Sequence, residues 1–158
     1  MKALVVYYSR TGKTKRVAEA VAKGLGADVE EIKDVRPRRG LFGFLRSGRE
    51  GMREVPGRIE QPKLDPSRYD LVVLGAPVWG SALASPVRGY LTERGKALPQ
   101  KVAFFCTQGG ENPGKTFAQL ETLCGRKPVA TVSLRSEHTQ GDALTQAVTR
   151  FVGEISRS

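Results

Sequence analysis

The sequence predicts an α/β protein built on a doubly wound parallel sheet. Segments with strand and helix patterns alternate along the chain, and the strand segments are continuous apolar runs instead of alternating apolar and polar residues. Such runs are typical of strands that are buried on both faces, which places helices on both sides of the sheet. The length of 158 residues, without a repeat or a linker, predicts a single domain over residues 1–158.

The predicted elements can be justified in chain order. The run 3–8 is rich in β-branched and aromatic residues, and the helix after it has apolar residues at helical spacing until Gly24 or Gly26 ends it. Pro86 opens a later helix, a position where proline is tolerated. Further strands are expected at 28–32, 71–76, 102–106 and 128–134, and further helices at 86–94, at 114–123 and around an apolar stripe from Ala143 to Ile155.

The segment 36–62 interrupts this alternation. It contains three prolines, five glycines and an apolar group formed by Leu41, Phe42, Phe44 and Leu45. Between Arg36 and Arg58 there are seven arginines against two glutamates, a net charge of +5. We expect this long excursion to be a flap or a docking surface near the carboxyl edge of the sheet, because so long a loop in a compact domain usually has a function. The alternative is a solvated loop with its phenylalanines tucked beneath it.

Composition excludes several classes of protein. The net charge of +10 and the pI near 10.0 are compatible with nucleic acid, an acidic protein partner, an anionic small ligand or solubility alone, with nucleic acid disfavoured. No apolar run approaches the ~20 residues that span a bilayer, and no signal-peptide pattern is present. Two cysteines and one histidine are too few for a disulfide scaffold or a typical zinc site. We therefore expect a cytoplasmic protein without a bound metal.

Ligands of doubly wound sheets bind at the carboxyl ends of the strands, so the segments that follow the first, third and fourth strands are the candidate site. The first is S-R-T-G-K-T at 9–14, where hydroxyls and a glycine precede a helix N-terminus. This pattern favours binding of one phosphate, with an ordinary helix cap as the alternative. Tyr7 stands where a P-loop has its first glycine, and no G-x-G-x-x-G follows the strand, which argues against ATP, GTP and dinucleotides.

The other two strand ends are suited to a flat ring. A-P-V-W-G-S at 76–81 contains the only tryptophan of the chain, which could stack on a heterocycle or cap the end of the sheet. The loop that begins at Thr107 contains Gly109 and Gly110, which would let a ligand approach the backbone, although these residue types also form ordinary turns. Cys106, Cys124, His138, Glu111 and Glu137 are interpreted as packing or solvated residues in preference to reactive ones.

The chain resembles the flavodoxin-like superfamily over its whole length in three motifs: S-R-T-G-K-T at 9–14, A-P-V-W-G-S at 76–81 and F-F-C-T-Q-G-G at 104–110. The resemblance implies a three-layer fold with a five-stranded parallel sheet in the order 2-1-3-4-5, and FMN as the cofactor. It also implies that the first motif holds the phosphate and that the other two line the ring. The implied cofactor-binding residues are Ser9, Arg10, Thr11, Gly12, Lys13 and Thr14 for the phosphate, and Pro77, Val78, Trp79, Gly80, Thr107, Gln108, Gly109 and Gly110 for the ring.

Two functions follow from the resemblance. One is an FMN-binding carrier that passes electrons to a partner protein, which the small size favours. The other is an FMN-dependent NAD(P)H or quinone reductase, favoured because the loop after the fourth strand lacks the tyrosine that carrier flavodoxins usually stack on the flavin. A third hypothesis, which the residues alone leave open, is a flavin-free or nucleic-acid-binding scaffold that uses only its charge. In the two flavin-dependent functions the cofactor supplies the chemistry and the protein positions it.

Overall fold

The structure, a computed structural model, describes residues 1–35, 56–80 and 82–158. Five parallel strands form its sheet in the spatial order β2-β1-β3-β5-β6, which confirms the predicted order when these five are counted along the chain. They are β1 (Ala3–Tyr7), β2 (Asp28–Glu31), β3 (Leu71–Trp79), β5 (Lys101–Gln108) and β6 (Pro128–Arg135). A short strand that the sequence did not predict, β4 (Ala82–Leu83), pairs antiparallel with β3.

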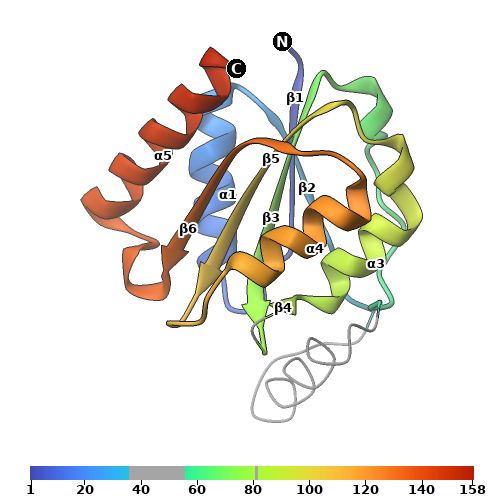
Figure 1. Ribbon diagram of the computed structural model, residues 1–158, viewed down its shortest axis with the longest axis horizontal. Helices are drawn as coiled ribbons and strands as arrows, with labels where there is room; N and C mark the ends of the chain where they lie inside the picture. Colours follow the sequence, from blue (N-terminus) through green and yellow to red (C-terminus); the bar gives the residue numbers. More distant parts are fainter. Residues whose placement is uncertain (36–55, 81) are drawn as a thin grey trace.

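Two layers of helices cover the sheet, as Figure 1 shows. Helices α1 (Lys13–Leu25) and α5 (Gly141–Arg157) lie together on one face, and α3 (Ser85–Arg94) and α4 (Gly114–Cys124) cover the other. Single-turn helices η1 (Pro66–Arg68), η2 (Gly95–Ala97) and η3 (Ser136–His138) complete the described elements. Of the two glycines proposed to end α1, Gly26 does so, in the left-handed conformation with φ of 61°.

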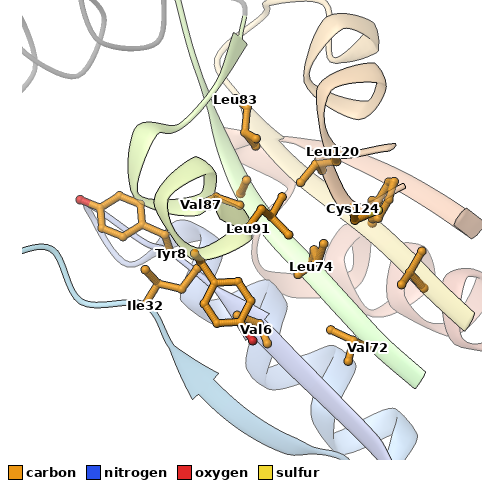
Figure 2. Close-up of a cluster of buried hydrophobic side chains, with 14 of the residues drawn as sticks. Val6, Tyr8, Ile32, Val72, Leu74, Leu83, Val87, Leu91, Leu120 and Cys124 are labelled. Atoms are coloured by element: carbon orange, nitrogen blue, oxygen red, sulfur yellow. The ribbon is translucent and has the colours of Figure 1, made fainter. Parts of the chain in front are cut away.

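Each face of the sheet has its own hydrophobic core, because successive strand residues point to opposite sides. On the α1 and α5 side, Val5, Val73 and Phe105 pack against helix residues such as Val21 and Phe151. On the α3 and α4 side, strand residues meet Val87, Leu91, Leu120 and others, as drawn in Figure 2. Burial of both faces explains why the three central strands, β1, β3 and β5, could be recognised as continuous apolar runs.

Three strands extend further than predicted, β6 by the single residue Arg135, and two are shorter. β3 continues through Trp79 and β5 through Gln108, although these residues were assigned to loops. Pro77 pairs with Thr107 in the parallel register, and the β4 hairpin holds the end of β3 beyond that point. Strand β1 ends one residue before Tyr8, and β2 ends before Ile32.

Most of the arginine-rich excursion lies outside the described residues, including its apolar group and every arginine between 36 and 58 except Arg58. The chain on its return pairs with the segment that leaves β2, through hydrogen bonds from the Val35 N–H to the Arg58 carbonyl (3.0 Å) and from the Glu60 N–H to the Lys33 carbonyl (2.8 Å). The buried carboxylate of Glu30 on β2 accepts further N–H groups from this return segment. These contacts hold the return segment beside the carboxyl end of β2.

None of the helices in the described residues is both long and apolar enough to span a membrane.

Candidate functional site

The carboxyl ends of β1, β3 and β5 meet around a cavity of about 260 Å³. All the residues predicted to form the cofactor site line it except Ser9, Gly12 and Gly110. Glu111 and Ser136 line it as well, although neither was predicted to. The lining residues from the three predicted motifs are Arg10, Thr11, Lys13, Thr14, Pro77, Val78, Trp79, Gly80, Thr107, Gln108 and Gly109.

The loop before α1 presents backbone N–H groups to one end of the cavity. Gly12 occupies the N-cap position with φ of 96°, a conformation that a side chain would strain, and its N–H donates to the Ser9 hydroxyl at 3.0 Å. Within the described residues no side chain caps this helix, and no acidic residue lies in its first turn. The first-turn amides and the positive end of the helix dipole are therefore available to an anion, beside the cationic side chain of Lys13.

A buried hydrogen bond joins this loop to the end of β5. The hydroxyls of Thr14 and Thr107 are 2.8 Å apart, and each side chain is almost completely buried. Both residues line the cavity. The bond therefore holds together two motifs that were identified separately in the sequence, residues 9–14 and the loop that begins at Thr107. The bond fixes the spacing between the α1 end of the cavity and the remaining wall.

The β3–β4 hairpin supplies the aromatic wall. Trp79 is only 6% exposed and pairs with Ala82 across the hairpin, and Gly80 makes the turn with φ of 55°. The ring of Tyr8 meets the Trp79 ring edge-on, with centroids 5.4 Å apart and planes at 89°. Trp79 thus belongs to the hydrophobic core and also lines the cavity, which combines the two roles that the sequence left as alternatives.

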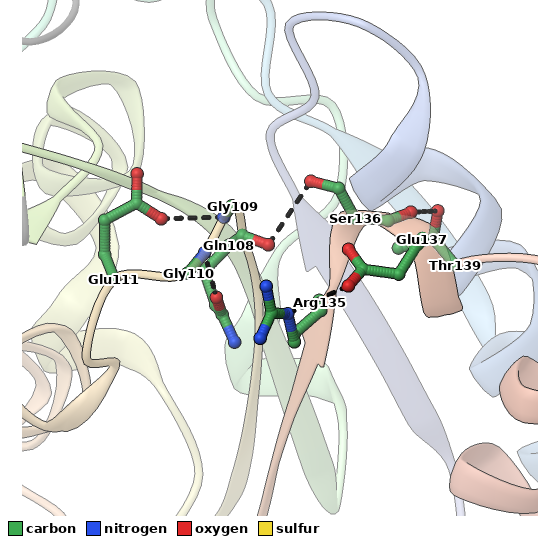
Figure 3. A network of polar contacts seen from close by, with 8 residues as sticks. All are labelled: Gln108, Gly109, Gly110, Glu111, Arg135, Ser136, Glu137 and Thr139. Atoms are coloured by element: carbon green, nitrogen blue, oxygen red, sulfur yellow. Dashed lines mark hydrogen bonds and ion pairs between the residues drawn. The ribbon is translucent and has the colours of Figure 1, made fainter.

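The loop between β5 and α4 satisfies its own amides. The Gly109 N–H donates to a carboxylate oxygen of Glu111 at 2.7 Å, and the Gly110 N–H donates to the side-chain carbonyl of Gln108 at 2.6 Å. Figure 3 shows both contacts beside the end of β6. Glu111 was interpreted as a solvated charge, and it is exposed, but it also lines the cavity through this turn. Gly110 has φ of 128°, a backbone conformation that favours glycine.

Ser136 is the lining residue that the sequence analysis did not consider at all, whereas Glu111 was considered and interpreted as a solvated charge. It opens η3 directly after β6, and its hydroxyl donates to the Gln108 carbonyl at 3.2 Å (Figure 3). Because β6 is parallel to β5 and adjacent to it, its carboxyl end reaches the same edge of the sheet. This placement could have been inferred from the predicted strand order if the fifth strand end had been searched together with the other three.

The remaining candidate residues have ordinary structural positions. Cys106 is fully buried, and this burial raises the pKa of its thiol well above the usual range, so it is protected from reaction. The thiol of Cys124 is buried at the end of α4. His138 is exposed in η3, and Glu137 forms an ion pair of 2.9 Å with Arg135. None of these four residues lines the cavity.

Comparison with known proteins places this geometry in context. Residues 2–151 match the protein family described as Flavodoxin. Similar solved structures include a flavoprotein from Lactobacillus acidophilus in complex with FMN, 23% identical with a TM-score of 0.72, covering 84% of this chain and 92% of that one. A candidate flavoprotein from Bacteroides eggerthii is 24% identical with a TM-score of 0.76 and 98% of each chain covered.

A flavodoxin from Megasphaera elsdenii in its two-electron reduced form is 18% identical, with a TM-score of 0.62 and 99% of each chain covered. These structures share the fold of the present chain over 84% to 99% of its length. No curated protein matches the chain.

Proposed function

The chain belongs to the flavodoxin family, and on this premise we propose that it is an FMN-binding redox protein that passes electrons to a protein partner. The observation that carries the proposal is the N-terminus of α1, which no described side chain caps and which opens into a cavity with an aromatic wall. A phosphate and a flat ring, joined in one ligand, match those two features.

The donors of the site suit FMN better than FAD. One helix N-terminus, with Thr11 and Thr14 beside it, offers a single compact group of amide and hydroxyl donors, which matches one terminal phosphate. We propose that residues 9–14 hold this phosphate and that Ser9 and Gly12 shape the loop from behind, since they do not line the cavity. When bound, FMN would supply the capacity to accept and donate electrons.

The ring would lie between the β3–β4 hairpin and the loop after β5. Trp79 is held by Tyr8, so it would offer a rigid apolar wall, while Gln108 and Gly109 offer backbone and amide groups on the other side. On binding, the Gly109 N–H would give up its hydrogen bond to the Glu111 carboxylate and donate to the ligand instead. Ser136 adds a hydroxyl at the junction with β6.

A second function, an FMN-dependent NAD(P)H or quinone reductase, is favoured by one observation. Trp79 is the only aromatic side chain among the described residues that line the cavity. A second substrate with a flat ring could therefore stack against the flavin on the side of residues 107–113, where none of the described lining residues is aromatic.

The partner remains a proposal on both readings. The charge of +10 favours an acidic protein or an anionic substrate, and the segment Arg36–Arg58 is the proposed docking region. The cytoplasmic location and the single domain over residues 1–158 likewise remain predictions from the sequence.

The purified protein tests the proposal directly. Stoichiometric FMN, extracted and identified by its phosphate, would support it, and a protein that binds no flavin would contradict it. Anaerobic photoreduction then separates the two functions. Reduction in two resolved one-electron steps favours the carrier, whereas direct bleaching by NADPH favours the reductase.

A further inference from the structure

A chain of hydrogen bonds runs from α1 to the ring side of the cavity. The Arg16 guanidinium donates through Nε to the Thr139 carbonyl at 3.1 Å and through Nη2 to the Thr139 hydroxyl at 3.0 Å. The Thr139 hydroxyl donates to the Ser136 carbonyl at 2.8 Å, and the Ser136 hydroxyl donates to the Gln108 carbonyl. Figure 3 shows the part of this chain that lies between Gln108 and Thr139.

The residues at the two ends of this chain differ in their relation to the cavity. Ser136 and Gln108 line it, whereas Arg16 and Thr139 do not. Thr139 is completely buried although it is polar, so its two oxygen atoms depend on the partners that the fold provides. The charged guanidinium of Arg16 supplies donors to both atoms, and hydrogen bonds from a charged donor are stronger than neutral ones.

We propose that Arg16 is a positioning residue of the flavin site, acting through Thr139 and Ser136 on the Gln108 peptide. This inference rests on the proposed function, because it assigns to Arg16 an effect on flavin binding. Arg16 fixes η3 against α1, η3 presents the Ser136 hydroxyl, and that hydroxyl holds the carbonyl next to Gly109. Arg16 does not act as a counter-charge for the phosphate, since its guanidinium is directed to Thr139 and not into the cavity.

A pair of neighbouring variants separates positioning from charge. Arg16→Gln and Lys15→Gln each remove one positive charge from an exposed residue of α1, but no described hydrogen bond of the Lys15 side chain is lost. Each variant is titrated with FMN and with riboflavin, which has the same ring but no phosphate. Loss of charge weakens FMN binding only, whereas loss of positioning weakens both.

We expect Arg16→Gln to raise the dissociation constants of FMN and riboflavin by about fivefold or more, the usual lower range for coupling between two sites. Lys15→Gln should leave riboflavin binding unchanged. Thr139→Val removes the hydroxyl and should weaken riboflavin binding, while Thr139→Ser keeps the hydroxyl and should restore it. The double variant Arg16→Gln/Thr139→Val should be no weaker than Arg16→Gln alone, because both changes break one chain of contacts.

The flavin-free protein gives a second readout. The backbone amide resonances of Gly109 and Gly110 should move in Arg16→Gln and in Thr139→Val, and stay in place in Lys15→Gln. Unchanged riboflavin affinity together with unmoved resonances would overturn the inference and make Arg16 a contact of the fold only. A wild-type protein that binds neither flavin would instead overturn the proposed function, and this inference with it.

Discussion

The two polar loops of the cavity, one before α1 and one after β5, differ in whether described side chains accept from their backbone N–H groups. Before α1, no described side chain accepts from the first-turn amides, and the side chains of Arg10 and Lys13 bring positive charge to that end. After β5, the amides of Gly109 and Gly110 are each satisfied by a side chain within two residues. The first loop is preorganised for an anion, whereas the second must exchange an internal acceptor before a ligand can use its amides.

The contrast has a consequence for affinity. At the α1 end, a phosphate would replace water on donors that have no competing acceptor in the described part of the chain. At the β5 end, each new hydrogen bond is offset by the one that it displaces, so the net gain is small. We therefore expect most of the polar binding energy to come from the α1 loop, with the β5 loop determining ring orientation and electron affinity.

The largest effect is expected from a carboxylate introduced into the loop before α1, comparable to the Glu111 carboxylate that already accepts from the Gly109 N–H in the loop after β5. Thr11→Glu places a carboxylate at the cavity wall beside the α1 amides, where it would compete with the phosphate and repel it. Two such charges about 4 Å apart near a protein surface repel by about 4 kcal/mol, so FMN affinity should fall at least a hundredfold. Fluorescence titration measures this loss, and the matched variant Thr11→Gln should keep most of the affinity. Stoichiometric FMN in Thr11→Glu would remove this loop from the site.

The contrast between the loops also marks how far the sequence could predict the site. The residues at the carboxyl ends of three strands were identified correctly as neighbours, because buried parallel strands are readable as apolar runs and their order brings these ends together. The internal acceptor Glu111 and the contributor Ser136 were not identified. The role of Glu111 depends on side-chain directions in a turn, which no local pattern reveals. The position of Ser136 follows from the pairing of β6 with β5, which the predicted strand order already contained.

The apolar wall provides the next largest effect. Trp79→Ala removes a side chain that is 6% exposed and packs edge-on against Tyr8, so we expect a loss of about 3 kcal/mol in the free energy of unfolding. FMN affinity should fall as well, because the wall of the ring site is lost. Urea denaturation of the flavin-free protein and FMN titration measure the two losses separately. Reduced stability with unchanged FMN affinity would show that Trp79 only caps the sheet.

The hydrogen bond between Thr14 and Thr107 connects the two loops, and breaking it should have an intermediate effect. Thr14→Val preserves the shape of the side chain but leaves the buried Thr107 hydroxyl without this partner, at a cost of about 1–3 kcal/mol in unfolding free energy. Thr14→Val/Thr107→Val removes both hydroxyls and should cost less than the sum of the single variants. Urea denaturation of all four proteins completes the cycle. Strictly additive losses would mean that the hydroxyl pair does not couple the loops.

The smallest effect concerns the acceptor of the second loop. Glu111→Gln retains a side-chain carbonyl that can accept from the Gly109 N–H, so the turn should keep its conformation while one negative charge leaves the cavity wall. Reduction adds negative charge to the bound flavin, and a nearby carboxylate opposes this. Removing that carboxylate should therefore raise the potential of the second reduction step. Exposure of Glu111 to solvent limits the rise to about 20–40 mV.

Asp142→Asn is the matched control for this measurement, because Asp142 lies in the first turn of α5 after η3 and does not line the cavity. A redox titration at two salt concentrations should show the rise for Glu111→Gln and none for Asp142→Asn, with a smaller rise at the higher salt because ions screen exposed charges. Equal shifts in both variants would mean that only the net charge of +10 matters. In that case, the Glu111 carboxylate would only stabilise the turn after β5, and the difference between the two loops would have no influence on the electron affinity of the flavin.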